Sequence, residues 1–360
     1  MNKEKSYFET LDLIRIIGSL WIVLYHYVGA GGYVLIDELK IFGYLTVRGN
    51  SFLDFFFMAS GFCIALNYRE KIQDGLISFK EFFLKHYLVF VVYAMITLPA
   101  AFVKQVLVFL TGEDEAPQAY KFVLDLFCLR TGYGSTEQPY NSPLWFINIL
   151  AQIYVIYFVY TKFLRKRFGS FGYAFFIVLG ITTYRDKNAF PVLYVVLQAL
   201  MNFSIGVLIY ELYKNKDIKS KYISGISICM LIVGMAFAFM DFKYRAFNML
   251  GDYRISASFL LWPQVIWLVV NKHISSEKAK KFVKRISGYS TSLFIWHHPL
   301  IYIYRGLSIL CGYPDEINKA YVIVLYVITL AVVAAISDVF LEKRIIKLFK
   351  KNFGIENSKG

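Results

Sequence analysis

The pairing of Arg15 with His26 inside one apolar run, residues 11–28, is the first feature of the chain that indicates chemistry. Ionisable side chains are costly inside a membrane, so those that remain there are candidate functional groups. Eleven residues at about 100° each bring both side chains to one face of a helix, about 16 Å apart along its axis. A guanidinium near one membrane surface and an imidazole deeper inside would suit a long amphiphilic ligand.

Two adjacent histidines, His297 and His298, form the second candidate group. Measured from the same membrane surface, they lie at a depth at which either could meet His26 inside a helix bundle. Because adjacent residues on a helix point about 100° apart, we expect only one of them to face a shared cavity with His26. Pro299 has no N–H, so it leaves the carbonyl of Ile295 without its helical donor and favours a kink there.

A third candidate is Asp54, in the second apolar run. A carboxylate inside a membrane needs a cationic partner, and the sequence offers Arg48 on the same helix or Arg15 on the first. Ser60 and Gly61 follow on the same helix, where small residues permit either close backbone approach or a break. Taken alone, these two residues are explained by packing as well as by chemistry.

The elements that must position these groups are membrane-spanning helices. The chain is 58% apolar and 19% aromatic, with a mean hydropathy of +0.51, well above a soluble domain. We therefore predict an all-α polytopic membrane protein. Apolar stretches of about 17 to 25 residues predict about ten spans, at residues 11–29, 44–67, 82–110, 143–161, 170–184, 190–213, 222–240, 255–271, 288–310 and 320–341.

Charge decides the predicted orientation. Most Lys and Arg residues fall at the two ends of the chain and in the loops after even-numbered spans, so both termini are expected in the cytoplasm. The net charge of +14 would also suit a nucleic-acid-binding protein. The basic residues cluster beside spans, however, as in residues 165–167 and 280–285, which indicates topology and anionic lipid headgroups instead.

One membrane domain is predicted for residues 1–360, with a core over about 8–350 and no appended soluble domain. The longest interruption, residues 111–142, falls on the outer side and contains Tyr133 and Tyr140. These tyrosines could stack on sugar rings, or the segment could be an ordinary solvated loop. The four scattered cysteines predict no disulfide framework, and because no histidines are spaced as in zinc sites, no metal is expected.

Three motifs resemble those of the integral membrane acyltransferases of family 3, which mostly O-acetylate bacterial surface polysaccharides. The first is Arg15 followed after ten residues by His26, a pair regarded as essential in that family. Another is the run Ser290 to Pro299, with His297 at the family histidine. The remaining motif lies in the second span and comprises Asp54, Phe56, Phe57, Ser60, Gly61 and Phe62.

The chain departs from that family at three places. Lys85 and His86 stand where many members have a pair of arginines, and Leu150, five residues after Trp145, replaces a glutamate. Glu342 opens an element that lacks the usual proline. Roles of the arginine pair and of the missing acid therefore cannot be transferred to this chain.

The resemblance implies a membrane-bound O-acyltransferase in the plasma membrane of a bacterium. It would move an acyl group, usually acetyl in this family, from cytoplasmic acyl-CoA to a hydroxyl of a cell-surface polysaccharide or its lipid-linked precursor. Two other interpretations remain open. Polar groups inside a membrane also mark the pathway of a transporter for a small organic acid or glycan precursor, and the chain could be a structural partner in a polysaccharide export assembly.

For the donor, we expect Arg15, near the cytoplasmic face, to hold the phosphates of acyl-CoA by charge-assisted hydrogen bonds, with Ser60 and Gly61 also at the donor site. His26 would deprotonate the acceptor hydroxyl or accept the acyl group itself as a covalent relay. His297 would carry a second proton or position the acceptor. Asp54 is expected to orient a histidine or to neutralise Arg15.

Overall fold

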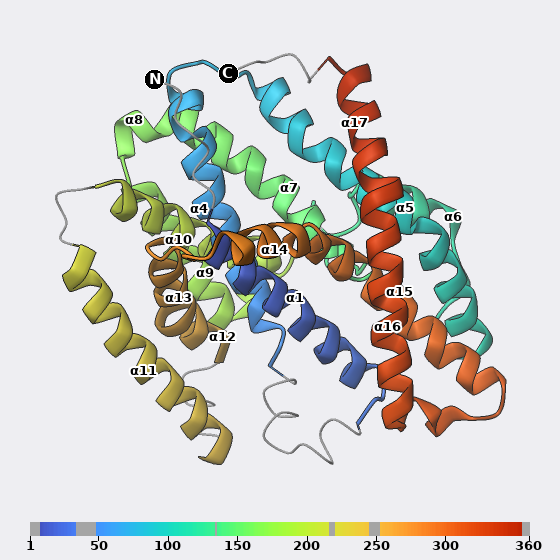
Figure 1. The fold of residues 1–360 in the computed structure, drawn as a ribbon. Coiled ribbons are helices and arrows are strands. Elements are labelled where there is room, and N and C mark those ends of the chain that lie inside the picture. Colours follow the sequence, from blue (N-terminus) through green and yellow to red (C-terminus); the bar gives the residue numbers. More distant parts are fainter. Residues whose placement is uncertain (1–7, 34–47, 134, 216–219, 245–252, 355–360) are drawn as a thin grey trace. The chain divides into compact units, whose positions relative to one another are not determined.

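The computed structural model describes residues 8–33, 48–133, 135–215, 220–244 and 253–354. Within these residues the regular structure is helical (Figure 1), apart from one isolated β-bridge between Gly132 and Ser135. The prediction of an all-α fold is confirmed. The chain forms two compact units, one of residues 1–17, 51–76 and 155–287 and the other of residues 18–50, 77–154 and 288–360.

The first unit is organised around α10, Tyr194–Lys214, which packs against α4 and α9. In the same unit, α11 packs against α13. The helices of this unit, together with the start of α1, are α4 Ser51–Gln73, α8 Arg165–Phe168, α9 Phe171–Arg185, α10, α11 Ser220–Tyr244, α12 Tyr253–Ser256, α13 Trp262–Val270 and α14 Glu277–Ser287.

Glycines bring the backbones of α4 and α10 into contact. A Cβ on Gly61 would lie 2.0 Å from the carbonyl oxygen of Phe203, and one on Gly206 would lie 1.8 Å from that of Met58. Both distances are far below van der Waals contact, so neither position can hold a larger residue without moving a helix. Of the two predicted uses of Gly61, close backbone approach is confirmed, because α4 runs unbroken through it.

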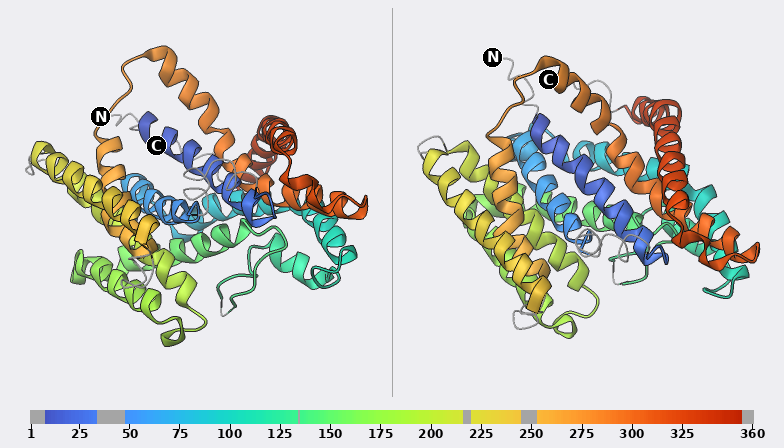
Figure 2. Two further views of the ribbon diagram at one scale, coloured as in Figure 1. Left: turned by 90° about the horizontal axis from the view of Figure 1, so that it is seen from below. Right: turned by 60° about the horizontal axis from the view of Figure 1, so that its bottom comes forward.

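The second unit is organised around α15, Tyr289–Leu310, which packs against α5 and α16 (Figure 2). Its apolar core includes Val23, Tyr27, Ile301 and Tyr326, from α1, α15 and α16. The helices of this unit are the end of α1 Glu9–Gly29, α5 Phe79–Leu110, α6 Ala119–Leu126, the start of α7 Leu144–Val159, α15, α16 Ala320–Ile336 and α17 Lys343–Asn352.

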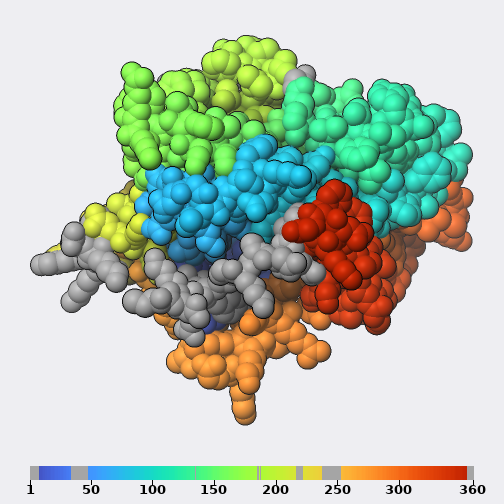
Figure 3. All heavy atoms as spheres, turned by 90° about the horizontal axis from the view of Figure 1, so that it is seen from above, coloured from blue at the N-terminus to red at the C-terminus, as the bar shows by residue number. Residues whose placement is uncertain are grey.

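Polar caps move the helix ends away from the limits that hydropathy predicts. α5 begins at Phe79 rather than residue 82, because Ser78 accepts a hydrogen bond from the Glu81 amide while the Glu81 carboxylate accepts one from the Ser78 amide. α4 begins only at Ser51, after a turn at residues 48–50, and the predicted start at 44–47 lies outside the described residues. At the C-terminal end, α17 packs against α5 and lies at the molecular surface (Figure 3).

Each of the ten predicted spans coincides with a helix in the described residues, but the helices are not equally suited to cross a membrane. Seven of the described helical segments are long and apolar enough. The segments Phe171–Tyr184 and Tyr222–Ala236 are apolar but shorter, and α15 falls outside both groups. The number of spans and the orientation of the termini therefore stay predictions. The seven candidate spans are Glu9–Gly29, Ser51–Gln73, Phe79–Leu110, Leu144–Phe168, Tyr194–Lys214, Tyr253–Val270 and Ala320–Asn352.

Candidate active site

α1 contains Arg15 and His26. It is one continuous helix from Glu9 to Gly29, with Arg15 in its first half and His26 near its last turn. The Arg15 guanidinium forms an ion pair with Asp12 at 3.0 Å, and its side chain is 41% exposed. A cation with one partner and this much exposure keeps hydrogen-bond donors available for a further anion.

Three imidazoles meet in the second unit. The ring centroid of His26 lies 4.9 Å from that of His297 and 5.5 Å from that of His298. The predicted meeting of His26 with the α15 histidines is therefore present in the structure. Among the described residues, no group of three or more His, Cys, Asp or Glu side chains could hold a metal ion.

The expectation that the two α15 histidines would not face one cavity together agrees with the cavity described below, whose lining includes His298 but not His297. Both rings nevertheless adjoin that of His26, and the planes of the His297 and His298 rings are 86° apart. An imidazole is wide enough to contact two side chains that diverge from a neighbouring helix. Divergent directions on one helix therefore do not prevent two residues from sharing one neighbour.

His297 is fully buried, and neither of its ring nitrogens has a hydrogen-bond partner among the described residues. The carbonyls of Leu293 and Phe294 lie nearby on the preceding turn, but neither forms a well-aligned hydrogen bond with the ring. Nδ1 of His298 is also buried without a partner. Buried polar groups are nearly always hydrogen-bonded, so unpaired ones point to a site that a ligand or water completes.

Pro299 shapes the backbone beside this cluster as predicted, by leaving the carbonyl of Ile295 without an amide donor. The side chain of Asn141 replaces that donor: its Nδ2 donates to the Ile295 carbonyl at 2.9 Å and to the Thr97 hydroxyl at 3.0 Å. Through these bonds Asn141 stabilises α15 one turn before the histidines, from a position 154 residues away in the chain. Sequence reasoning missed this residue.

A second network fixes the other side of α15. The indole of Trp296 donates to the Ser337 hydroxyl at 2.9 Å, and both Ser337 and Ser292 donate to Glu342 Oε1 at 2.7 Å. Glu342 is 3% exposed, in a π-helical turn that ends at this residue. The motif around His297 and the element at Glu342 are thus joined by hydrogen bonds, although that element lacks its usual proline.

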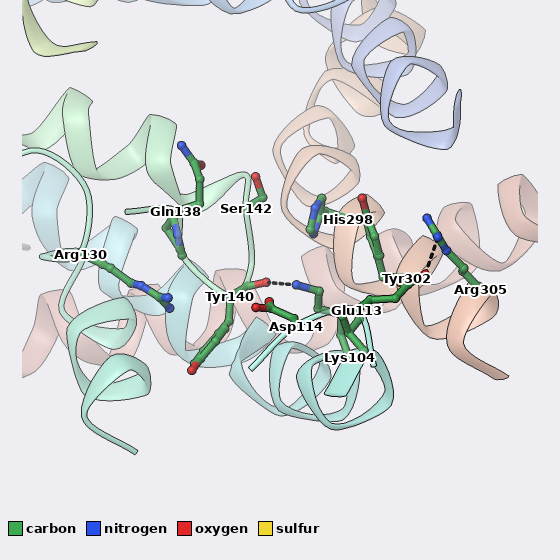
Figure 4. Close-up of a pocket in the computed structure, with 12 residues that line it drawn as sticks. Lys104, Glu113, Asp114, Arg130, Gln138, Tyr140, Ser142, His298, Tyr302 and Arg305 are labelled. Carbon is green, nitrogen blue, oxygen red and sulfur yellow. Dashed lines mark hydrogen bonds and ion pairs between the residues drawn. The ribbon is translucent and has the colours of Figure 1, made fainter. Parts of the chain in front are cut away.

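A cavity of about 400 Å³ opens beside His298 (Figure 4). It lies next to the C-terminal end of α1, because Arg305, in its lining, donates to the carbonyl of Ala30 at 3.1 Å. The predicted loop 111–142 supplies much of the wall and contains a helix of its own, α6. The lining comprises Lys104, Val108, Glu113, Asp114, Arg130, Gln138, Pro139, Tyr140, Ser142, His298, Tyr302 and Arg305.

Asp54 belongs to the first unit, where the structure gives it a partner that the sequence did not indicate. Its two carboxylate oxygens accept from Arg254, at 2.6 Å and 2.8 Å, and Oδ1 also accepts from Tyr184 and Asn202. The expected neutralisation of Arg15 by Asp54 is wrong, since Arg15 pairs with Asp12.

The comparison with protein families shows the family of the chain. A family model described as an acyltransferase domain, acyltransferase family 3, matches residues 8–338. The chain belongs to acyltransferase family 3. No curated protein and no solved structure matches it significantly. Family membership supports an acyltransferase activity, and its apolar helices mark this acyltransferase as a multi-pass membrane protein.

The acyltransferase thus brings together three of the chemistry-bearing residues that the sequence singled out, His26, His297 and His298. Asp54 and Arg15 have ion-pair partners in the first unit. Ser60 is partly exposed on α4, and the bare face of Gly61 contacts α10, so their assignment to the donor remains untested.

Lys104 is the cavity residue that sequence reasoning missed. It is 7% exposed inside the apolar helix α5. The signal was available, because a lone lysine in an apolar span is as costly as the arginine that drew attention to α1.

Proposed function

We propose that this acyltransferase transfers an acyl group, acetyl in the first instance, from cytoplasmic acyl-CoA to a hydroxyl of a cell-surface polysaccharide or its lipid-linked precursor. It would do so in a bacterial plasma membrane with both termini in the cytoplasm. The observation that carries this proposal is the cluster in which the half-buried His26 adjoins the buried His297 and His298 while three ring nitrogens on α15 have no described partner. Proton transfer requires such uncommitted imidazole nitrogens.

In the direct route, His26 takes the proton of the acceptor hydroxyl as its oxygen attacks the thioester carbonyl. The new ester C–O bond forms, the C–S bond breaks, and the leaving thiolate of CoA recovers the proton from His26. In the relay route, a nitrogen of His26 attacks the thioester carbonyl, the C–S bond breaks, and the leaving thiolate of CoA takes the proton of the other imidazole nitrogen. The acceptor hydroxyl then attacks the acyl carbonyl, the C–N bond breaks, and the hydroxyl proton returns to His26. His297 serves either route as a second proton carrier or as a hydrogen-bond partner of the acceptor.

Arg15 has the chemistry to receive the donor. Its guanidinium pairs with Asp12 through one terminal nitrogen and is substantially exposed, which leaves N–H groups for phosphate oxygens. Arg15 and His26 lie on one helix, about 16 Å apart by the helical rise. A pantetheine arm bound along α1 would connect phosphates at Arg15 with a thioester near His26.

The test uses purified full-length protein in lipid nanodiscs with radiolabelled acetyl-CoA and glycan from an acylated bacterial surface. We expect His26→Ala to lower transfer by about 10²- to 10⁴-fold, the range for a lost general base. The matched control is His273→Ala, because His273 is exposed and pairs only weakly, at 3.5 Å, with Glu9. Wild-type transfer by inserted His26→Ala protein would contradict the assignment.

Arg15→Ala is expected to raise KM for acetyl-CoA without preventing insertion, whereas Arg167→Ala, at an exposed position, should leave KM unchanged. An unchanged KM in Arg15→Ala would remove the donor role of Arg15. Movement of an organic acid or glycan precursor across the membrane, with neither transfer nor hydrolysis of the label, would support a transporter instead.

A further inference from the structure

The cavity beside His298 has a lining that is more polar than apolar. Val108 and Pro139 are its only aliphatic residues, and the others include two tyrosines, three cations and two carboxylates (Figure 4). Its volume of about 400 Å³ lies within the range for small-ligand sites, about 300 to 1,000 Å³. A lipid tail would gain nothing from such walls, whereas a saccharide with its many hydroxyls could form hydrogen bonds on every side.

The three cations differ in how far they are neutralised. Arg130 forms ion pairs with Asp125 at 3.3 Å and Glu137 at 3.4 Å, and Arg305 forms one with Glu113 at 2.5 Å. Lys104 forms no ion pair at 4.0 Å or less with a carboxylate of the described residues, although Asp114 and Asp125 lie close enough to interact electrostatically with it. Its ammonium donates instead to the carbonyl of Tyr140 at 3.2 Å.

Lys104 is nevertheless almost fully buried. A buried ammonium with no directly paired carboxylate is costly, because one carbonyl dipole and carboxylates at a distance replace only part of its lost hydration. Its remaining donors are available to an anion in the cavity. The ring of Tyr302, whose centroid lies 5.4 Å from the ammonium, supports the positive charge but cannot neutralise it.

His298 connects this cavity with the imidazole cluster. Its ring centroid lies 4.6 Å from that of Tyr302 on one side and 5.5 Å from that of His26 on the other. Its Nδ1 is buried with no partner among the described residues, in the wall of the cavity. A ligand bound at Lys104 would therefore lie against Tyr302 and His298, and the His298 ring in turn adjoins that of His26, which is not itself in the lining.

We propose that this cavity is the acceptor subsite and that the acceptor sugar bears a negative charge, a carboxylate or a phosphate, which Lys104 binds. The aromatic ring of Tyr302 flanks the sugar, and His298 orients the hydroxyl that receives the acyl group. This inference rests on the proposed acyl transfer and adds the chemical class of the acceptor.

Binding is measured first, so that it does not depend on transfer. Purified full-length protein is titrated with trigalacturonate, which has a carboxylate on each ring, and with the matching neutral galactose trimer. We expect wild-type protein to bind the acidic trimer about ten- to a hundredfold more tightly, as expected for a hydrogen bond to a charged group. Equal affinity for both trimers overturns the proposal without any variant.

Three variants identify the group responsible. Lys104→Met should bind both trimers equally, Lys104→Arg should keep the preference, and Lys166→Met, at an exposed position, should match wild type. A preference that survives in folded Lys104→Met overturns the role of Lys104. In transfer assays with acetyl-CoA, Lys104→Met should raise KM for the acidic acceptor by a similar factor and change kcat much less.

Two further arms distinguish the possible outcomes. Phosphatidylglycerol added to neutral nanodiscs should not displace trigalacturonate, and competition that disappears in Lys104→Met would assign the cavity to a lipid phosphate and overturn the sugar. His26→Ala should keep the binding preference while losing transfer. Selective binding without any transfer by wild-type protein would contradict the proposed function and leave the anionic subsite standing.

Discussion

Asp54 in the first unit and the three histidines in the second are both buried ionisable groups on apolar helices, but their surroundings differ. The Asp54 carboxylate accepts two bonds from Arg254 and one each from Tyr184 and Asn202. By contrast, neither nitrogen of His297 has a described hydrogen-bond partner. Buried groups whose hydrogen bonds are formed within the protein stabilise the fold, whereas those with unused hydrogen-bonding atoms can bind a substrate or water.

The comparison teaches that cost alone does not identify a site. In the sequence, Asp54 and His26 are both candidate functional groups, because each is an ionisable residue in an apolar span and is costly inside a membrane. What separates them is whether protein groups already use their hydrogen-bonding capacity. We therefore expect substitutions at Asp54 to affect mainly stability, and substitutions in the histidine cluster to affect mainly activity.

Asp54→Leu should have the largest effect on stability. It leaves the Arg254 guanidinium without its carboxylate, and loss of one member of a buried ion pair costs about 3 to 5 kcal/mol. Thermal unfolding in detergent measures the change, with Asp74→Asn, at an exposed position after α4, as the control. Wild-type stability of Asp54→Leu combined with lost transfer would break the comparison and return Asp54 to the catalytic groups.

His297→Asn should show the opposite pattern. Transfer is expected to fall by about 100-fold, while the unfolding temperature changes little because the ring forms no hydrogen bond that would be lost. His86→Asn is the matched control, because the His86 ring, unlike that of His297, has a hydrogen-bond partner: its Nδ1 contacts the Phe82 carbonyl at 2.7 Å. A large loss of stability with unchanged kcat in His297→Asn would show that this histidine serves packing.

Asn141→Leu tests the support of the histidine cluster and should cost about 1 to 3 kcal/mol, because it leaves the carbonyl of Ile295 buried and unpaired. Pro299→Ala restores an amide donor for that carbonyl. In a double-mutant cycle, Asn141→Leu should therefore cost less in the Pro299→Ala background. Additive losses would mean that the bond to Ile295 contributes nothing.

Asp125 lies between the two extremes, because its Oδ2 accepts from the Tyr140 amide at 2.8 Å and from Arg130 while its buried Oδ1 has no described partner. Burial raises the pKa of Asp125 from its usual value near 4 to about 6. Between these values the folded protein binds more protons than the unfolded chain, so stability falls as pH rises from about 4 to about 6 and is constant above.

Asp125→Asn should remove this slope while keeping an acceptor for the Tyr140 amide. Unfolding temperatures of both proteins between pH 4 and pH 8 measure the effect, which we expect to be the smallest of the four. An unchanged slope in Asp125→Asn would assign the pH dependence to another group.

Much of the fold could be predicted because helices in an apolar solvent follow from local composition. The expected spans at 82–110 and 190–213 agree with α5 and α10 to within a few residues. Their ends could not be predicted from hydropathy, because polar caps such as Ser78 extend a helix beyond its apolar stretch. The three π-helical turns, at Tyr160–Leu164, Ala257–Leu261 and Ser337–Glu342, have no signal in apolar composition.

The site was predictable where its chemistry is local and unpredictable where distant residues complete it. The sequence indicated His26, His297 and the unpaired carbonyl left by Pro299. It could not indicate that Asn141 would bind that carbonyl, or that Arg254, 200 residues from Asp54, would pair with the carboxylate that was expected to neutralise Arg15. Hydrogen bonds over such separations depend on tertiary packing, which one sequence does not encode in a readable pattern.

Under the proposal that the cavity binds the acceptor, the bond from Asn141 to Ile295 also limits which residues can be exchanged with a relative to change acceptor specificity. The loop that lines much of the cavity ends beside Asn141. The residues of the cavity wall and the residue that binds Ile295 can therefore be exchanged separately. A chimera that grafts residues 111–140 from a relative while keeping Asn141 would exchange the wall and preserve α15. A graft that includes Asn141 would disturb the helix that presents the histidines, and its loss of activity would be mistaken for a change of substrate.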